Sequence, residues 1–108
     1  MGECNKETTF EILDYFYDNG GNFIDTANNY QNEESEIWVG DWMEARKNRD
    51  QIVLATKFTS PFRKANASDE NIVNTVGNGA KSLRVSFNAS LKKLKTDYID
   101  LLWMHWYV

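Results

Sequence analysis

Cysteine, proline and basic charge are all scarce in this sequence. Cys4 is the single cysteine, so an intrachain disulfide cannot form. The formal net charge of -4 lacks the basic excess that is typical of nucleic-acid binders, and we expect no nucleic-acid partner. The amino terminus lacks the pattern of a signal peptide, and the longest apolar run, residues 98–108, is shorter than the ~20 residues that cross a bilayer. These absences favour a cytoplasmic protein with no membrane partner.

The order of the predicted elements points to a class of fold. Helical spacing predicts helices at about 6–18, 33–47 and 80–95, and apolar runs predict strands at about 22–27, 51–58 and 98–106. Strands separated by helices imply parallel pairing through right-handed crossovers. No Gly-x-Gly-x-x-Gly turn follows any strand, which argues against an open dinucleotide-binding sheet. The best fit is α/β: a partial (β/α)8 barrel of the TIM type, with about three parallel strands and covering helices, in one domain over residues 1–108.

Several structural expectations follow from the helical patterns. The polar stretch 59–79 contains the only proline, Pro61, and a loop this long is typical of a binding loop, with room for a short helix near Ile72.

The second helix is expected to bury Ile37, Trp38, Trp42 and Ala45, and the third Leu83, Phe87, Leu91 and Leu94. The lysines at 92, 93 and 95 are interpreted as a solvated helix end, where cations complement the helix dipole. Structural roles are assigned to the acidic residues Asp100, Glu33, Glu34 and Glu36.

Each predicted strand has one ionisable residue near its carboxyl end: Asp25, Lys57 and His105. A charge within an apolar strand is costly unless it has a partner. If alternation places these side chains on the inner face of a barrel, they converge at the top rim, where barrel enzymes have their active sites. Lys57 would then pair with Asp25. Tyr30, in the loop after the first strand, could lie over them.

Each of these residues has a simpler interpretation when it is taken alone. Tyr30 could pack at the rim, and Lys57 could be a strand-end lysine that extends its ammonium into water. Asp25 could cap the following turn, and His105 could be a core histidine. Four such coincidences at the strand ends are improbable together, so the combined pattern favours a functional site.

At this point the sequence resembles a known family, the aldo-keto reductases. The segment "FIDTANNYQNEESEIWVG" is similar to its Asp-Thr-Ala signature with a tyrosine at the same interval, and "IVLATKF" to its lysine strand. The segment "SLRVSFNASLKKLKTDYIDLLWMHW" resembles its helix and histidine strand, most closely in the fungal aryl-alcohol dehydrogenase branch.

This resemblance implies a catalytic tetrad of Asp25, Tyr30, Lys57 and His105 at an NADP(H) cofactor, with a small aldehyde or alcohol as substrate. Tyr30 would protonate the carbonyl oxygen, because a nearby ammonium favours the ionised form of a phenol and so eases proton release. Asp25 would hold Lys57 and also lie against the ribose of the cofactor. His105 would orient the carbonyl oxygen. For Trp106 and Tyr107, contact with substrate and simple packing are equally supported.

The chain departs from the family in length, because barrels of this kind have eight strands and about 250 residues. The first strand and the carboxyl-terminal half are expected to be absent, together with most of the cofactor site. We therefore expect a truncated chain that is inactive alone and self-associates through open sheet edges. The alternatives are a non-catalytic remnant or partner-binding module, and a metal hydrolase that uses Asp25 and His105. The metal alternative is weak because Lys57 would repel a cation.

Overall fold

Three parallel strands form one sheet in the computed structural model, which describes residues 3–62 and 72–106. The strands are β1 (Phe23–Asp25), β2 (Val53–Phe58) and β3 (Leu101–Met104), and their order in the sheet is β1-β2-β3. The expected parallel pairing is therefore confirmed. A helix lies in the chain between the two strands of each neighbouring pair, as in the β-α-β units in which parallel strands usually pair.

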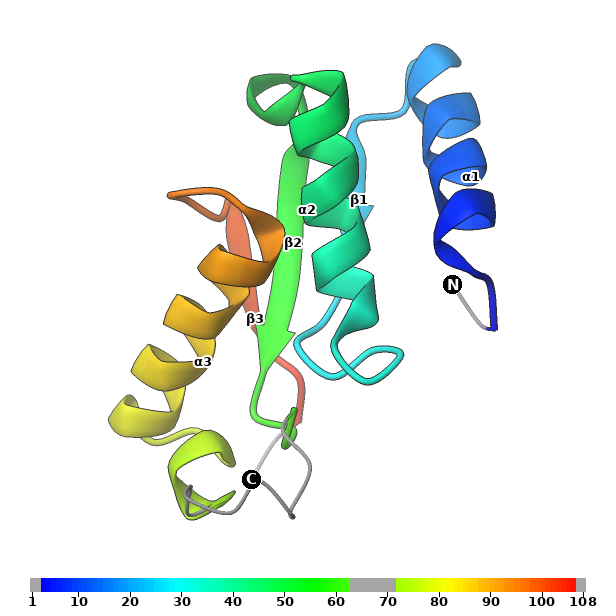
Figure 1. The fold of residues 1–108 in the computed structure, drawn as a ribbon. Helices are drawn as coiled ribbons and strands as arrows, with labels where there is room; N and C mark the ends of the chain where they lie inside the picture. The colour runs from blue at the N-terminus through cyan, green and yellow to red at the C-terminus, as the bar shows by residue number, and fades with distance from the viewer. Residues whose placement is uncertain (1–2, 63–71, 107–108) are drawn as a thin grey trace.

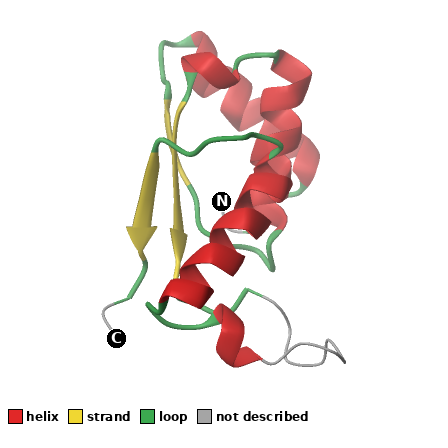
Figure 2. Ribbon diagram, turned by 90° about the vertical axis from the view of Figure 1, so that its left-hand side faces the viewer, coloured by secondary structure: helices red, strands yellow, loops and turns green. Residues whose placement is uncertain are grey.

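The helices lie on one side of this sheet (Figures 1 and 2). They are α1 (Lys6–Asp18), α2 (Glu34–Arg46) and α3 (Ala80–Leu94), with short 3-10 turns at Arg49–Gln51 and Ile72–Thr75. The second of these turns lies where a short helix was expected within the loop, while residues 63–71 of that loop lie outside the described residues. None of the helices in the described ranges has the length and apolar character that a bilayer crossing requires.

The strands are shorter than the sequence predicts, but the ladder continues beyond their ends. Asp25 is the last residue of β1, and His105 lies just after β3. Beyond β1, the Asn28 N–H donates to the carbonyl of Lys57, and beyond β3 the His105 N–H donates to the carbonyl of Phe58. These bonds keep the segments after β1 and β3 close to the end of β2, where the candidate site lies.

The core lies between the sheet and the helices. Its buried apolar side chains are Leu13, Ile24, Val39, Trp42, Met43, Ile52, Leu54 and Leu94. The predicted burial of Trp42 is confirmed, but Ile37 and Ala45 are exposed and Trp38 is half-buried. The buried residues of α2 instead include Glu36, Val39 and Gly40. Glu36 pairs with Lys93 of α3, and Gly40 lies against the α3 backbone, so these two contacts set the orientation of α2.

The buried face of α3 consists mainly of small residues. It is formed by Ser82, Ser86, Ser90 and Leu94, spaced one helical turn apart. The prediction that Leu83, Phe87 and Leu91 are buried is therefore wrong, since Leu83 is exposed and the other two are half-buried. Small side chains permit close approach of a helix backbone, and the larger apolar residues then lie on its flanks.

A carboxylate on α1 joins this helix to α2. The Asn5 side chain caps α1 by accepting the Thr8 N–H. Further along the helix, Asp14 accepts hydrogen bonds from the Trp42 indole at 2.8 Å and from both Nε and Nη2 of Arg46. Two-point binding of a carboxylate by arginine is strong and directional.

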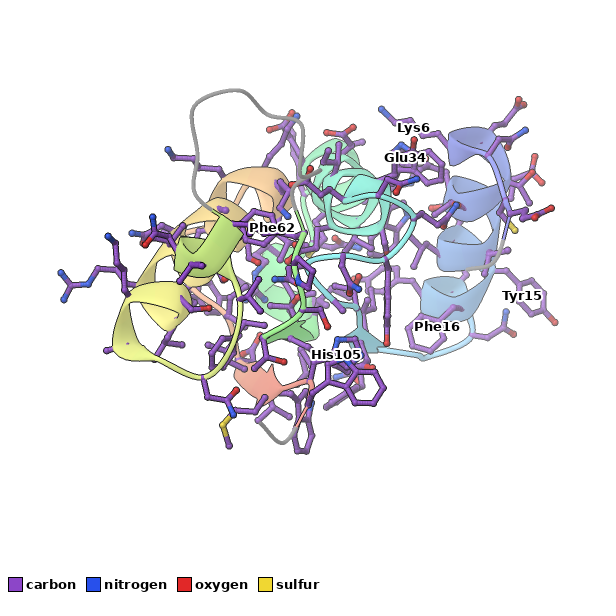
Figure 3. All side chains as sticks on the ribbon, turned by 90° about the horizontal axis from the view of Figure 1, so that it is seen from below. Lys6, Tyr15, Phe16, Glu34, Phe62 and His105 are labelled. Atoms are coloured by element: carbon purple, nitrogen blue, oxygen red, sulfur yellow. The ribbon has the colours of Figure 1, made fainter. Side chains whose placement is uncertain are left out.

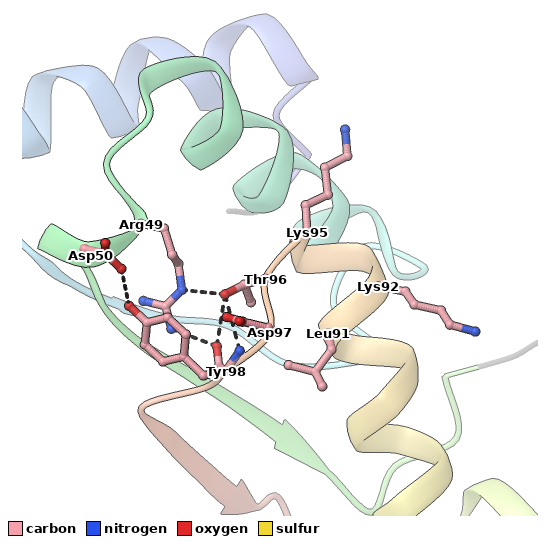
Figure 4. Close-up of a pocket in the computed structure, with 8 residues that line it drawn as sticks. All are labelled: Arg49, Asp50, Leu91, Lys92, Lys95, Thr96, Asp97 and Tyr98. Atoms are coloured by element: carbon pink, nitrogen blue, oxygen red, sulfur yellow. Dashed lines mark hydrogen bonds between the residues drawn. The ribbon is translucent and has the colours of Figure 1, made fainter.

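Arg49 joins the second and third strands at their amino ends. Its guanidinium donates to the Thr96 hydroxyl, to the carbonyls of Ile52 and Tyr98, and to Asp100, as Figure 4 shows in part. The group also lies 3.7 Å from the centre of the Tyr98 ring. Asp100 in turn accepts the Leu54 N–H of β2. The structural role predicted for Asp100 is thus confirmed, at the end of the sheet opposite to Lys57.

We predict that Gly40→Ala destabilises the fold. Alanine normally favours a helix over glycine by about 1 kcal/mol, but a Cβ at Gly40 would lie 2.4 Å from the backbone oxygen of Lys93. Overpacking typically costs about 1–3 kcal/mol, so a net loss of stability is expected in urea denaturation. The control is Gly79→Ala, where a Cβ meets nothing within 4 Å. Equal or greater stability of Gly40→Ala would contradict the close contact between α2 and α3.

We also predict that Asp14 contributes pH-dependent stability. Hydrogen bonds from Arg46 and Trp42 lower the pKa of Asp14 from 3.8 to about 2. Because the pKa is lower in the folded state, this contribution is complete above pH 3.8 and is lost as the pH falls through about 2. The difference in urea midpoint between the wild type and Asp14→Asn should therefore shrink across that range. The exposed Glu11→Gln on the same helix is the control.

Candidate active site

Lys57 lies at the centre of the predicted cluster. Its Nζ is 2.6 Å from Oδ2 of Asp25, 2.8 Å from the carbonyl oxygen of Thr26 and 3.5 Å from the hydroxyl of Tyr30. These partners come from β1 and the loop that follows it. The pairing expected from the sequence, with Tyr30 within reach of Lys57, is therefore present.

The ion pair between Asp25 and Lys57 explains how a carboxylate is accommodated at the end of an apolar strand. The Lys57 side chain is only 15 % exposed, whereas that of Asp25 is 45 % exposed. The lysine is thus the more desolvated partner, and it requires acceptors to remain charged. A carboxylate and a backbone carbonyl provide them. The Asp25 carboxylate remains accessible to a ligand.

Tyr30 is carried by a tightly turned loop. Its N–H donates to the carbonyl of Ala27, and the three residues that follow, 31–33, all have positive φ. Below the turn, a hydrogen bond of 2.7 Å joins the hydroxyls of Thr26 and Ser35, both buried. This short polar loop therefore sets the position of the phenol beside Lys57.

His105 lies beside Tyr30 at the carboxyl ends of the strands, the end seen in Figure 3. The two rings meet edge to face, with centroids 5.6 Å apart. Burial lowers the pKa of His105, and the positive charge of Lys57 lowers it further, while Asp25 opposes the shift. The imidazole is therefore held in its neutral form at neutral pH, in which one ring nitrogen donates a hydrogen bond and the other accepts.

A buried ion pair lies on the helix side of β2. Glu36 of α2 is fully buried, accepts the hydroxyl of Thr56 at 2.9 Å and lies 2.8 Å from Nζ of Lys93 on α3. Lys93 also donates to the carbonyl of Asn28 and pairs with Glu33 at 3.3 Å. The interpretation of Lys93 as part of a solvated helix end is therefore wrong. Through its contacts with Asn28 and Glu33, Lys93 holds both ends of the loop that carries Tyr30.

An open hollow of about 440 Å³ lies over the face of the sheet that the helices leave bare. It is lined by Phe23, Asp25, Lys57, Trp103, Met104 and His105. Polar groups of the cluster thus lie beside aromatic walls, an arrangement that suits an aromatic or heteroaromatic ligand. Among the residues that the structure describes, no three or more His, Cys, Asp or Glu side chains lie together as a metal-binding group.

The loop after β2 contributes two residues that sequence reasoning missed. The Thr59 hydroxyl accepts the backbone N–H of Trp106, and the Ser60 hydroxyl accepts its indole N–H. Hydroxyl residues in a long polar loop give no signal in the sequence that separates them from their neighbours. Thr59 and Ser60 come to lie beside Trp106, next to His105, only when the ends of β2 and β3 are paired.

Comparisons with known proteins agree with this geometry. The aldo/keto reductase family model matches residues 1–108. The chain is 59 % identical to norsolorinic acid reductase B of Dothistroma septosporum over 98 % of this chain and 27 % of that protein. It is 58 % identical to the Saccharomyces cerevisiae protein named "Putative aryl-alcohol dehydrogenase AAD14", over 99 % of this chain and 28 % of the relative. The predicted resemblance to the fungal aryl-alcohol dehydrogenases is thus confirmed.

The fold comparison leads to the same family. A solved structure described as a putative aldo-keto reductase from Pseudomonas aeruginosa superposes with a TM-score of 0.72 and 27 % sequence identity. The match covers 94 % of this chain and 36 % of that one. The chain therefore spans about a third or less of these three relatives, and the expectation of a partial barrel is confirmed. Its sequence, its fold and its family match together show that the chain belongs to the aldo/keto reductase family.

Proposed function

We propose that this chain provides the catalytic groups of an NADP(H)-dependent oxidoreductase that interconverts aromatic aldehydes and alcohols. The observation that carries the proposal is the position of the Lys57 ammonium between the Asp25 carboxylate and the Tyr30 hydroxyl, at 2.6 and 3.5 Å. The names of the relatives, which include aryl-alcohol dehydrogenases, support this substrate class. Because the chain covers a minor part of most of these relatives, the complete activity is proposed for a barrel that includes the remaining segments.

The phenol of Tyr30 is the proposed proton donor. During reduction the phenol O–H proton passes to the carbonyl oxygen and leaves a phenolate, and during oxidation the phenolate of Tyr30 accepts the proton of the alcohol hydroxyl. The Lys57 ammonium stabilises the phenolate that reduction leaves, by Coulombic attraction in a partly desolvated site. Asp25 keeps the ammonium in this position.

His105 is proposed to orient the substrate. Its neutral imidazole can donate a hydrogen bond to the carbonyl oxygen while Tyr30 approaches the same atom. Two donors that converge on one oxygen stabilise the negative charge that develops there. Trp106, adjacent to His105 in sequence, is a proposed neighbour of the bound aromatic ring.

The residues at this site fit the reactive end of a nicotinamide cofactor. The Asp25 carboxylate is exposed and can accept a hydrogen bond from a ribose hydroxyl, while Phe23 and Trp103 form apolar walls of the hollow. The bound cofactor supplies the hydride to the carbonyl carbon. Within this chain, Asp25 is the residue proposed to contact it directly.

A second candidate function is a non-catalytic module that binds partners through the bare face of the sheet. The observation in its favour is the exposure of large apolar side chains there, with Phe23 49 % and Trp103 48 % exposed. Exposed apolar surface of this kind commonly marks an interaction site. NADPH oxidation that depends on an added aromatic aldehyde separates the two candidates.

In a barrel completed with the missing β/α units, Tyr30→Phe should lower kcat for an aromatic aldehyde by roughly 10²–10⁴, the usual contribution of general acid catalysis. Both kcat and kcat/KM should fall together, because the lost interaction acts in the transition state. The exposed Tyr15→Phe, on α1, is the matched control and should leave the rate unchanged. Normal turnover by Tyr30→Phe would assign the proton to another group.

In the same completed barrel, Lys57→Met should also abolish most of the turnover. It removes the positive charge that stabilises the phenolate but keeps an apolar side chain of similar length. Stopped-flow fluorescence should show a smaller change in NADPH affinity than in kcat. A selective loss of cofactor affinity with normal kcat would instead assign Lys57 to cofactor binding.

The 108-residue chain by itself should show no NADPH oxidation in the presence of aromatic aldehydes. Positioning of two reactants can contribute about 7–11 kcal/mol of barrier lowering, and the hollow in this chain is open. We also expect this chain to self-associate through its uncovered strand edges, which sedimentation velocity measures. Robust Tyr30-dependent reduction by the monomer would overturn this prediction.

A further inference from the structure

The segments after β2 and β3 are joined by a series of hydrogen bonds between consecutive residues. The N–H of His105 donates to the carbonyl of Phe58 at 3.0 Å. The N–H of Trp106 donates to the Thr59 hydroxyl at 3.0 Å, and its indole N–H donates to the Ser60 hydroxyl at 2.8 Å. Both polar groups of Trp106 that can donate a hydrogen bond are therefore satisfied, although the residue is 62 % exposed. An exposed tryptophan held at two points has a defined orientation.

In this orientation the indole of Trp106 covers one face of the His105 imidazole. The rings of His105 and Trp106 are stacked, with centroids 5.4 Å apart and an interplanar angle of 13°. Tyr30 meets the same imidazole edge to face, at 5.6 Å. The imidazole is thus enclosed between the proposed proton donor and an anchored indole. Stacked and edge-to-face arrangements are the ones that aromatic rings prefer.

The other usual means of fixing a histidine ring is missing at this site. A functional histidine is commonly oriented by a hydrogen bond from its second ring nitrogen to a carbonyl or carboxylate. Nδ1 of His105 is buried and has no hydrogen-bond partner among the described residues. Its ring orientation therefore depends on the flanking aromatic rings.

The backbone that supports Trp106 is strained. Thr59 has φ of +97°, which is unusual for a β-branched residue. It is nevertheless buried, and its carbonyl accepts the N–H of Gly77 at 2.9 Å. Strained residues persist where the surrounding structure fixes them, and they often occur at functional sites. At Thr59 this conformation presents the hydroxyl to Trp106.

The Ser60 end of this arrangement is also linked to the first loop of the site. The Asn28 side-chain amide lies 3.4 Å from the carbonyl oxygen of Ser60 and is fully buried. Asn28 belongs to the loop that carries Tyr30. The loops after all three strands are therefore connected around His105.

We propose that Trp106, anchored by Thr59 and Ser60, is a positioning residue that holds the imidazole of His105 against the ring of Tyr30. The catalytic purpose of this arrangement rests on the proposed function, but the arrangement itself can be tested without activity. His105 is the only histidine in the sequence, so its imidazole protons give a single set of NMR signals.

The test compares the imidazole proton shifts and the pH titration of His105 in the 108-residue chain and its variants. In the wild type, the stacked indole should move the imidazole signals upfield of their random-coil positions. Trp106→Leu should abolish this shift and raise the pKa of His105 toward its ordinary value, because the imidazole loses cover while Lys57, Asp25 and Tyr30 still face it. Ser60→Ala should reduce the upfield shift. Ser86→Ala, which removes another buried serine hydroxyl, should leave it unchanged.

A double-mutant comparison tests the hydrogen bond between the Trp106 indole N–H and the Ser60 hydroxyl. Trp106→Phe keeps an aromatic ring but has no N–H to donate to Ser60. Ser60→Ala should therefore alter the His105 signals when residue 106 is tryptophan and leave them unchanged when it is phenylalanine. Equal effects in both backgrounds would overturn the proposed anchor.

Two further outcomes would also overturn the proposal: wild-type imidazole signals at random-coil positions, or an upfield shift that persists in Trp106→Leu. Neither outcome concerns hydride transfer, so the proposed function could survive the loss of this inference. Conversely, a completed barrel that shows no carbonyl reduction would reject the proposed function without affecting the NMR result.

Discussion

The ion pair between Glu36 and Lys93 is the constraint on which the rest of the structure depends. Glu36 is fully buried, and removing one partner of such a pair typically costs about 3–5 kcal/mol because the other charge remains unpaired. The pair joins α2 to α3, and the Thr56 hydroxyl joins it to β2. Lys93 also bonds to Asn28 and Glu33, which flank Tyr30. Thr56 and Lys57 are adjacent on β2, and their side chains point to opposite faces. The strand therefore contacts the Glu36 carboxylate on its helix-covered face and the Asp25 carboxylate on its bare face. The site on the bare face is thereby supported by a second ionic contact on the helix-covered face.

The parallel pairing of the strands and the cluster of Asp25, Tyr30, Lys57 and His105 could be predicted from the sequence. Alternation along a strand and the geometry of parallel pairing determine both, and neither depends on details of packing. The buried faces of the helices could not be predicted in this way. Apolar periodicity assigns Leu83 and Phe87 to the core, whereas close contact between α2 and α3 requires Gly40 and places serines of α3 inside. Lys93 was misassigned for a related reason, because its buried partner becomes visible only when α2 and α3 are packed together.

The two faces of the sheet differ in what covers them. The helices bury one face in a core that includes Trp42 and Leu54, while Phe23 and Trp103 line a hollow on the other. The polar cluster lies on this second face, where a ligand and additional protein segments can reach it. Side-chain order at the cluster therefore has to come from the strand ends and their loops. The bonds of Thr59 and Ser60 to Trp106 are one such source of order.

The position of the Arg49 cluster has a consequence for how proteins of this kind can diverge. Arg49, Asp100 and Tyr98 join the strands at their amino ends, whereas Tyr30 and His105 lie at the carboxyl ends. Mutations that enlarge, shrink or recharge the loops at the carboxyl ends of the strands therefore leave the Arg49 contacts intact. Changes in sequence at the carboxyl-end loops can therefore accumulate without a matching loss of foldability, because the contacts that join the strands lie at the opposite end of the sheet.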